Sequence, residues 1–503
     1  MNCLTVMVQG TTSDAGKSTL VCALGRALKR KGLNVAPFKP QNMALNSAVT
    51  IDGGEIGRAQ ALQAQACGLE PICDFNPVLL KPSSDIGCQV IINGHVAAQL
   101  SAVNYHEYKP TAMKAVLAAH KRLETEFDVV VVEGAGSPAE INLRERDIAN
   151  MGFAEEVDCP VILIADIDRG GVFAHLTGTL ACLSQSEQDR VIGFVINRFR
   201  GDRALLTSGN DWLEAQTGKP VLAVLPYLQG LYLDSEDSVA TEQHSNDAKL
   251  KVIVPVYPRI SNHNDLDAMR AHPQLDVELV GPQLTANHPP ADVIILMGSK
   301  NTQADLKWMK EQGWDKTLAK HLRYGGKVIA ICGGMQMLGQ LIDDPLAIES
   351  INAEQSEGLG YLPLSTTMGK AKELTLKQGV IGFPGQEPVS ISGYEIHAGS
   401  TDYQRNEILP IVIDKDNPNN TGAGFLSSDQ QIFASYWHGL MDTPQALNAI
   451  ITWASHGDEF EQVDYEALRE QSIDALADSL EQEFDWQEYE AQLKKFNSSR
   501  YVS

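Results

Sequence analysis

The feature that most constrains the fold lies near the start of the chain, where an apolar run, a loop bounded by glycines and a helical pattern follow one another. Five residues separate Gly10 from Gly16, and Lys17-Ser18-Thr19 opens the helical pattern. Backbone N–H groups in such a loop, together with the positive end of the helix, form a cradle for phosphate groups. The common P-loop spacing has four residues between the glycines, but the order of strand, loop and helix is the same. We therefore expect an ATP site at Gly10, Gly16, Lys17, Ser18 and Thr19, with Lys17 reaching the β- and γ-phosphates and Ser18 ligating Mg²⁺.

Apolar runs rich in β-branched residues recur through the first half of the chain and alternate with helical patterns. Uninterrupted runs of this kind are typical of parallel strands that are buried on both faces of a sheet. They predict an α/β P-loop domain with a parallel sheet over residues 1–233. The helix after the loop is expected at 17–31, and the strands at 4–8, 33–37, 129–132, 161–165, 191–196 and 221–224.

A second α/β series follows a polar stretch without apolar periodicity. Residues 234–250 are expected to be a linker, and residues 251–445 a second α/β domain. Its strands are expected at 251–256, 277–280, 293–297, 328–331 and 432–436. Residues 446–503 predict an acidic, helical C-terminal extension whose packing positions are Trp453, Leu468, Ile473, Leu476 and Leu480.

The charge and cysteine content limit the classes of partner. The formal net charge of −24 argues against nucleic acid, because phosphate backbones are bound by clustered Lys and Arg. The eight cysteines are scattered without paired spacing, which favours reduced thiols and a cytoplasmic protein. No apolar run approaches the roughly 20 residues of a membrane span. We expect neither a nucleic acid nor a membrane as partner.

Polar residues follow several of the expected strands in the first domain. Glu133 ends the strand at 129–132, at the edge of a parallel sheet where ligands bind, and is a candidate Mg²⁺ ligand together with Ser18. Glu55 is a weaker candidate for a second acidic metal contact. Asn197 is expected at the adenine of ATP, and Lys39 at a substrate carboxylate or at the transferred phosphoryl group.

The second domain contains a cysteine in a position typical of nucleophiles. Cys332 follows the strand at 328–331 and precedes two glycines and a helical pattern expected at 335–341. Such a strand–turn–helix step lifts the sulfur from the sheet, and the helix N-terminus favours the thiolate. The N–H groups of Gly333 and Gly298 are candidate oxyanion donors. His438, directly after a strand, is the expected base, and His397 is a competing candidate better interpreted as structural or on the substrate side.

Taken together, these motifs resemble those of the cobyric acid synthases. The resemblance runs from about residue 5 to residue 442 and is far more specific than any single motif. It is carried by residues 9–18, 39–47, 54–60, 133–137, 258–262, 298–302, 332–336 and 393–397. The first domain also resembles dethiobiotin synthetase, and the second resembles class I glutamine amidotransferases. In those amidotransferases a Glu stands two residues after the His, but Leu440 occupies that position here. This departure matches the corrinoid branch of these enzymes, whose catalytic residues resemble a Cys–His dyad. It leaves open what orients His438.

The resemblance implies an activity and its cofactors. It implies that ATP and Mg²⁺ activate carboxylates b, d, e and g of adenosylcobyrinic acid a,c-diamide as acyl phosphates. Ammonia released from glutamine by Cys332 and His438 would then displace the phosphate, so corrinoid and glutamine are the expected partners. The order of amidations, the corrinoid contacts and the oligomeric state stay open.

Three alternatives also stay open. The first is the a,c-diamide synthase of the same pathway, although residues 39–47 and 54–60 favour cobyric acid synthase. The second is a dethiobiotin synthetase-like ligase with an inert second domain, against which the intact Cys332 and His438 argue. The third is a P-loop switch ATPase without amidase activity, which the acidic charge balance disfavours.

Overall fold

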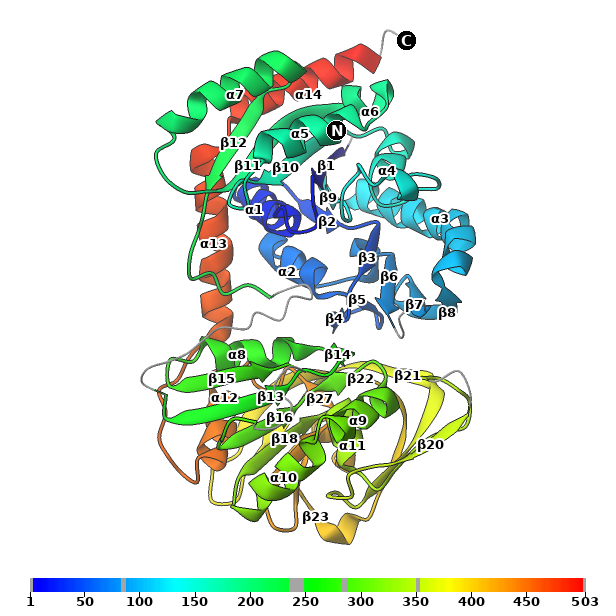
Figure 1. Cartoon of the computed structure of the whole chain (residues 1–503), viewed down its shortest axis with the longest axis vertical. Helices are drawn as coiled ribbons and strands as arrows, with labels where there is room; N and C mark the ends of the chain where they lie inside the picture. The colour runs from blue at the N-terminus through cyan, green and yellow to red at the C-terminus, as the bar shows by residue number, and fades with distance from the viewer. Residues whose placement is uncertain (1–2, 83–86, 235–247, 282–287, 350–352, 501–503) are drawn as a thin grey trace.

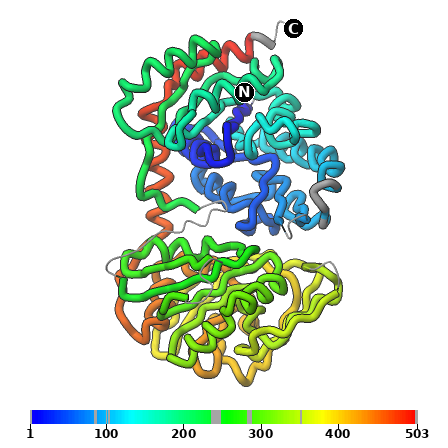
Figure 2. Tube along the Cα trace, viewed as in Figure 1, coloured from blue at the N-terminus to red at the C-terminus, as the bar shows by residue number. Residues whose placement is uncertain are grey.

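The computed structural model describes residues 3–82, 87–234, 248–281, 288–349 and 353–500. Two α/β bodies lie one above the other, and the last two helices of the chain return to the first body (Figure 1; Figure 2). Within the described residues, no helix combines the length and apolar character needed to cross a membrane. Most of the expected linker, residues 235–247, lies outside the described residues.

The first body is built on a parallel sheet of six strands in the order β12-β11-β10-β1-β9-β2. The central strands are fully buried because both faces are covered by helices, which explains their β-branched composition. All six expected strands are present, so the predicted parallel α/β sheet is confirmed. Their bounds are β1 Leu4–Gly10, β2 Val35–Phe38, β9 Val129–Glu133, β10 Val161–Asp166, β11 Val191–Phe199 and β12 Val221–Pro226.

Helices flank this sheet, and a smaller sheet lies on the side that faces the second body. The helices are α1 Lys17–Arg30, α2 Arg58–Cys67, α3 Ala102–Glu126, α4 Met151–Glu156, α5 Val172–Ala181, α6 Gln185–Arg190 and α7 Ala204–Thr217. The small sheet has the order β3-β6-β7-β8, and β4 pairs with β5 beside it. The sequence analysis did not anticipate these strands: β3 Gln41–Met43, β4 Ser47–Val49, β5 Glu55–Gly57, β6 Val78–Pro82, β7 Gly87–Ile92 and β8 His95–Ser101.

The second body contains a seven-stranded sheet in the order β15-β13-β16-β18-β26-β25-β23. The five expected strands form its parallel part; β25 pairs antiparallel with β26, and the edge strand β23 pairs antiparallel with β25. The bounds are β13 Leu250–Pro255, β15 Leu275–Val280, β16 Val293–Leu296, β18 Lys327–Ile331, β23 Ile408–Pro410, β25 Phe425–Ser427 and β26 Ile432–Ser435. The helices are α8 Asp267–Ala271, α9 Thr302–Glu311, α10 Trp314–Arg323, α11 Gly333–Leu338 and α12 Pro444–Ala454.

A second sheet of this body includes the long antiparallel hairpin of β21 and β22. Its strands are β19 Leu341–Asp344, β20 Glu354–Glu357, β21 Leu364–Ile381, β22 Val389–Tyr403, β24 Val412–Asp414 and β27 Trp437–His438. A two-stranded pair, β14 Ile260–Ser261 and β17 Gly298–Ser299, lies apart from it. The helix expected at 335–341 ends at Leu338, because Gly339 leaves the helix and Leu341 begins β19.

The C-terminal helices α13 (Tyr465–Glu483) and α14 (Trp486–Arg500) belong to the core of the first body. Leu480 is fully buried there, and Ile473 packs against Cys22 on α1 and Leu62 on α2. Arg26 of α1 pairs with acidic side chains of α13. The acidic composition of the extension thus matches the basic face of α1. Of the other expected packing positions, Trp453 on α12 is buried in the core of the second body, Leu468 packs against that same core, and Leu476 packs against the core of the first body.

Replacement of Leu480 by Ala tests this packing. We expect Leu480→Ala to lower the free energy of unfolding by about 2–5 kcal/mol, because it removes buried methyl groups and leaves a cavity. Leu205→Ala is the matched control, since Leu205 is 83% exposed on α7. Chemical denaturation of both variants makes the comparison, and equal losses would contradict the assignment of α13 to the core.

Candidate active sites

The glycine loop between β1 and α1 is closely packed, and side chains on its two glycines would not fit. Gly16 has φ 98°, and a Cβ there would lie 2.0 Å from Nδ2 of Asn197. A Cβ on Gly10 would lie 2.7 Å from the carbonyl oxygen of Thr12 and 2.9 Å from Nζ of Lys17. The loop therefore keeps its backbone close to the Lys17 ammonium, as a phosphate cradle requires.

Lys17 and Thr19 are held by backbone carbonyls around the loop. The Lys17 ammonium donates to the carbonyl oxygens of Thr12 at 3.0 Å, Ser13 at 2.9 Å and Gly136 at 3.0 Å. These neutral acceptors place a buried cation where the phosphates of a nucleotide would lie. The Thr19 hydroxyl donates back to the Gly16 carbonyl oxygen at 2.8 Å.

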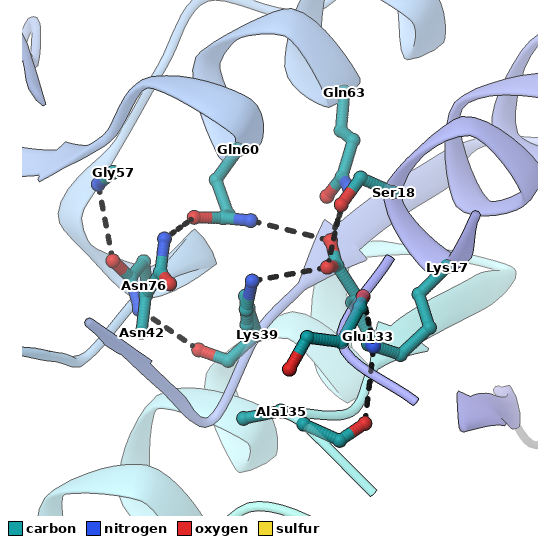
Figure 3. Close-up of polar contacts among 12 residues, drawn as sticks. Lys17, Ser18, Lys39, Asn42, Gly57, Gln60, Gln63, Asn76, Glu133 and Ala135 are labelled. Atoms are coloured by element: carbon teal, nitrogen blue, oxygen red, sulfur yellow. Dashed lines mark hydrogen bonds and ion pairs between the residues drawn. The ribbon is translucent and has the colours of Figure 1, made fainter. Parts of the chain in front are cut away.

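Glu133, at the end of β9, is the centre of a buried polar cluster (Figure 3). Its Oε1 accepts from the Ser18 hydroxyl at 2.7 Å and from the Lys39 ammonium at 3.0 Å, and its Oε2 accepts from the Gln63 amide at 2.5 Å. Burial opposes its ionisation, but Lys39 and the three hydrogen bonds hold the pKa of Glu133 below its usual range. The carboxylate and the Ser18 hydroxyl are hard oxygen donors of the kind that Mg²⁺ takes alongside phosphate oxygens. The structure thus brings together the expected Ser18, Glu133 and Lys39.

Two cavities flank the loop. The larger, about 440 Å³, is lined by Lys17, Ser18 and Lys39. The smaller, about 170 Å³, is lined by Thr19, Asn197 and apolar residues at the ends of β11 and β12. Asn197 also donates from Nδ2 to the Ala15 carbonyl oxygen at 3.1 Å, so it supports the loop as well as facing the smaller cavity.

Glu55 does not join this cluster. Its Oε2 accepts from the Lys81 ammonium at 2.6 Å, and its Oε1 pairs with Lys372 of β21 in the second body. Both carboxylate oxygens are therefore neutralised by lysines, at the junction of the two bodies. We drop Glu55 from the proposed metal site. Its position in a sequence motif gave no signal of lysine partners that lie 26 and 317 residues away.

Cys332 stands on a strained turn between β18 and α11. Its φ of 52° and ψ of −110° are unusual for a residue with a side chain. The next residues must be glycine: a Cβ on Gly333 would lie 2.7 Å from the Ser299 nitrogen, and one on Gly334 would lie 2.2 Å from the Leu296 carbonyl oxygen. The close packing of Ser299, on β17, against Gly333 brings the segment that contains Gly298 beside the turn.

His438 is fully buried and is oriented by an acid that the sequence analysis missed. Asp265 lies in a short helix after β14; its Oδ2 accepts from His438 Nδ1 at 2.7 Å, and its Oδ1 accepts from the Gly439 N–H at 2.8 Å. Burial lowers the pKa of His438, but Asp265 and Cys332 outweigh it and raise that pKa to about 10. A protonated His438 held between Asp265 and Cys332 can store a proton and donate it. Asp265 therefore takes the place of the Glu that the related amidotransferases carry at the position of Leu440. In the sequence, the only sign of Asp265 was its nearness to the motif at 258–262.

His397 lies on β22 and has partners of its own. Its Nε2 bonds to Glu395 Oε1 at 2.9 Å, and its ring stacks on Tyr436 with centroids 3.7 Å apart. Both His397 and Cys332 line a cavity of about 560 Å³. The bond to Glu395 and the stacking leave His397 in the wall of this cavity, whereas Cys332 is among the groups that raise the pKa of His438.

The cavity over Cys332 is lined by both bodies. Lys300 and Lys372 come from the second body, whereas Lys81 and Gln89 come from the first. Lys300 donates to Gln89 Oε1 at 2.6 Å across the junction. A ligand in this cavity would therefore contact both bodies at once.

Comparisons with known proteins agree with this division. The sequence model of the CobQ/CobB/MinD/ParA nucleotide binding domain matches residues 6–239, and that of the CobB/CobQ-like glutamine amidotransferase domain matches residues 251–446. The cobyric acid synthase of Marinomonas sp. (strain MWYL1) is 56% identical over 489 residues, which cover 96% of this chain and 97% of that protein.

Solved structures resemble parts of the chain only weakly. A structure of PurLQS from Thermotoga maritima matches 45% of this chain and 98% of its own chain, at 16% identity and a TM-score of 0.29. A crystal structure of a glutamine amidotransferase matches 41% of this chain and 98% of its own, at 13% identity and a TM-score of 0.31. We draw nothing from similarities of this size.

The role of Asp265 predicts a measurable titration. In the native protein we expect His438 to stay protonated until the pH approaches about 10, because its buried imidazolium faces Asp265. Asp265→Asn removes the counter-charge, so the pKa of His438 should fall by more than about one unit. The stability that the raised pKa contributes is present below the unfolded-state pKa of about 6.5 and is lost as the pH rises through about 10. NMR titration of isotopically labelled histidines measures the shift, and an unchanged titration of His438 would contradict the pairing.

Proposed function

The chain belongs to the cobyric acid synthase family, and from this membership we propose that it amidates carboxylates b, d, e and g of adenosylcobyrinic acid a,c-diamide. The family establishes a glutamine-hydrolysing amidating enzyme of cobalamin biosynthesis with a nucleotide-binding domain. The substrate carboxylates, the residue roles and the acyl-phosphate route are our proposal. The observation that carries it is the presence in one chain of a phosphate cradle with a buried Lys39–Glu133 pair and a thiol with a buried His–Asp pair.

We propose that glutamine is hydrolysed at Cys332. The Cys332 sulfur attacks as the thiolate partner of protonated His438 and bonds to the side-chain amide carbon, while N–H groups of Gly298 and Gly333 stabilise the negative oxygen. His438 gives its proton to the departing nitrogen, so that ammonia leaves and a thioester remains. Water then gives a proton back to His438 and attacks the thioester carbon, which releases glutamate and regenerates the thiolate. Asp265 keeps Nδ1 of His438 as the hydrogen-bonded nitrogen, so that Nε2 serves the sulfur.

The first domain would activate the corrinoid. A carboxylate oxygen attacks the γ-phosphorus of ATP, ADP leaves, and an acyl phosphate forms. Ammonia then attacks the acyl carbon, and phosphate leaves as the amide forms. Lys17 and Lys39 would stabilise the charge that develops on the transferred group, and Asn197 would border the adenine. Ser18 and Glu133 would hold Mg²⁺, which neutralises charge on the β- and γ-phosphates when bound.

Ammonia has to reach the acyl phosphate before solvent protonates it, and one short segment connects the two sites. Glu55 lies between two lysines that line the Cys332 cavity, whereas Gln63 bonds to Glu133. Between them α2 begins at Arg58, so the helix from Arg58 to Gln63 spans only about 8 Å at 1.5 Å per residue. We propose that ammonia passes along the buried polar side chains of this segment.

A cysteine variant separates the two activities. Cys332→Ala should lower glutamine-driven amidation by more than about 10³-fold, because the nucleophile is lost, but should keep ammonia-driven amidation within about threefold. Cys182→Ala is the control, since Cys182 is an exposed thiol that lines none of the cavities at the two sites. Loss of both activities in Cys332→Ala, with the control intact, would contradict the two-site scheme.

Mass spectrometry of the corrinoid product tests the function itself. Incubation of adenosylcobyrinic acid a,c-diamide with the protein, Mg-ATP and glutamine should convert four carboxylates stepwise to amides. If the a,c-diamide stays unchanged and cobyrinic acid is amidated instead, the a,c-diamide synthase assignment replaces ours. If neither corrinoid changes while ATP is hydrolysed, the P-loop switch ATPase becomes the better interpretation.

A further inference from the structure

Exposed apolar side chains border the cavity of about 440 Å³ next to the glycine loop. Met43 on β3 is 55% exposed and Leu143 is 56% exposed, and both line this cavity together with Lys17 and Lys39. Ile141 is 61% exposed and belongs to the same short helix as Leu143. We call Met43, Ile141 and Leu143 the apolar rim.

The apolar rim has no structural task within the described residues. None of its three side chains belongs to a hydrophobic cluster of the fold, and the short helix at Ile141–Leu143 buries no residue. Large apolar side chains that gather at a polar cavity are typical of a ligand-binding surface. The rim therefore points to a ligand with an apolar body and a polar part that enters the cavity.

The charged groups in the same cavity show which polar part fits. Asp14 pairs with Arg169, Asp147 accepts backbone N–H groups, and Arg144 pairs with Glu187. Glu140 adds one acidic side chain to the lining. Lys109 of α3 also lines the cavity; burial lowers its pKa more than the nearby Asp147 raises it, and no carboxylate of the described residues lies within ion-pair distance of it. A carboxylate of a ligand would neutralise the charge of this partly buried lysine.

We infer that the apolar rim supports the corrin macrocycle of the substrate, that Lys109 pairs with one peripheral carboxylate, and that a second carboxylate reaches Lys39. The inference rests on the proposed function and deepens it. A corrin is a broad, largely apolar ring with acidic side chains around its edge. The apolar rim suits the apolar face of the ring, and Lys39 and Lys109 suit the acidic side chains at its edge.

This arrangement also explains how one site serves four carboxylates. Each of the four has to reach the same Lys39–Glu133 pair, so the ring must bind in four orientations. Directional hydrogen bonds to the ring would favour one orientation over the others. Contacts with Met43, Ile141 and Leu143 are apolar and non-directional, so they support the ring in every orientation.

Corrinoid binding in the absence of ATP and glutamine tests the inference. Equilibrium dialysis with adenosylcobyrinic acid a,c-diamide, followed by its visible absorbance, gives Kd. We expect Met43→Asp and Leu143→Asp each to raise Kd about tenfold, because each loses an apolar contact and adds a charge that repels carboxylates. Leu143→Met should keep Kd within about twofold, because it preserves the apolar surface. Leu205→Asp is the matched control at an exposed leucine on α7 and should bind as the native protein does.

The outcomes separate this inference from the proposed function. If the native protein does not bind the corrinoid, the proposed function fails and the inference fails with it. If the native protein binds but both aspartate variants bind equally well, with unchanged melting temperatures, the rim does not hold the ring. Product analysis adds a second criterion: the aspartate variants should slow all four amidations, and slowing of only one would overturn the non-directional role of the rim. Should an aspartate variant melt early, Met43→Ser and Leu143→Ser answer the same question.

Discussion

The buried carboxylate of Glu55 is the interaction on which the arrangement of the two domains depends. It accepts from Lys81 of its own domain at 2.6 Å and pairs with Lys372 of the other domain. Removal of one partner from such a buried pair typically costs about 3–5 kcal/mol, because a charge is left without compensation. Burial lowers the pKa of Lys372 to about 8 even though Glu55 raises it, so the lysine is held charged chiefly by this contact. The two lysines line the cavity of Cys332, and the domain junction is therefore also part of the proposed glutamine site.

A second carboxylate ties the C-terminal helices to the phosphate site. Asp234, at the end of the first domain, accepts from Arg58 Nε at 2.7 Å and from the Tyr465 hydroxyl at 3.0 Å. Arg58 begins α2, and Gln63 on the same helix bonds to Glu133. Tyr465 begins α13, which packs on α1 directly after the glycine loop. The helices α13 and α14 are thus structural parts of the nucleotide domain rather than an appendage.

The sequence predicts those features whose signal is local. The parallel strands follow from uninterrupted apolar runs, and the positions of Lys17 and Cys332 follow from glycines that the packing requires. Contacts between distant segments leave no such signal. Asp265 lies 173 residues from His438, and Lys372 lies 317 residues from Glu55. The strands β3, β4 and β5 were missed for a related reason: each has only three residues, so its periodicity is too brief to distinguish it from a loop.

The segment that carries Asp265 is held by the first domain, although Asp265 itself contacts His438 of the second. In the related triads the acid is two residues from the histidine, so its position is fixed by one strand. Here it comes from a separate segment, whose neighbours are held by the first domain: Asn262 Oδ1 accepts from the Ser47 N–H at 3.1 Å, and His263 Nε2 bonds to Asn46 Nδ2 at 2.9 Å. Any shift of the first domain that moves Asn46 and Ser47 also moves the acid that orients His438. In the proposed scheme, the glutamine site would be complete only while the domain that consumes ammonia is docked against it, and this dependence would couple ammonia release to its use.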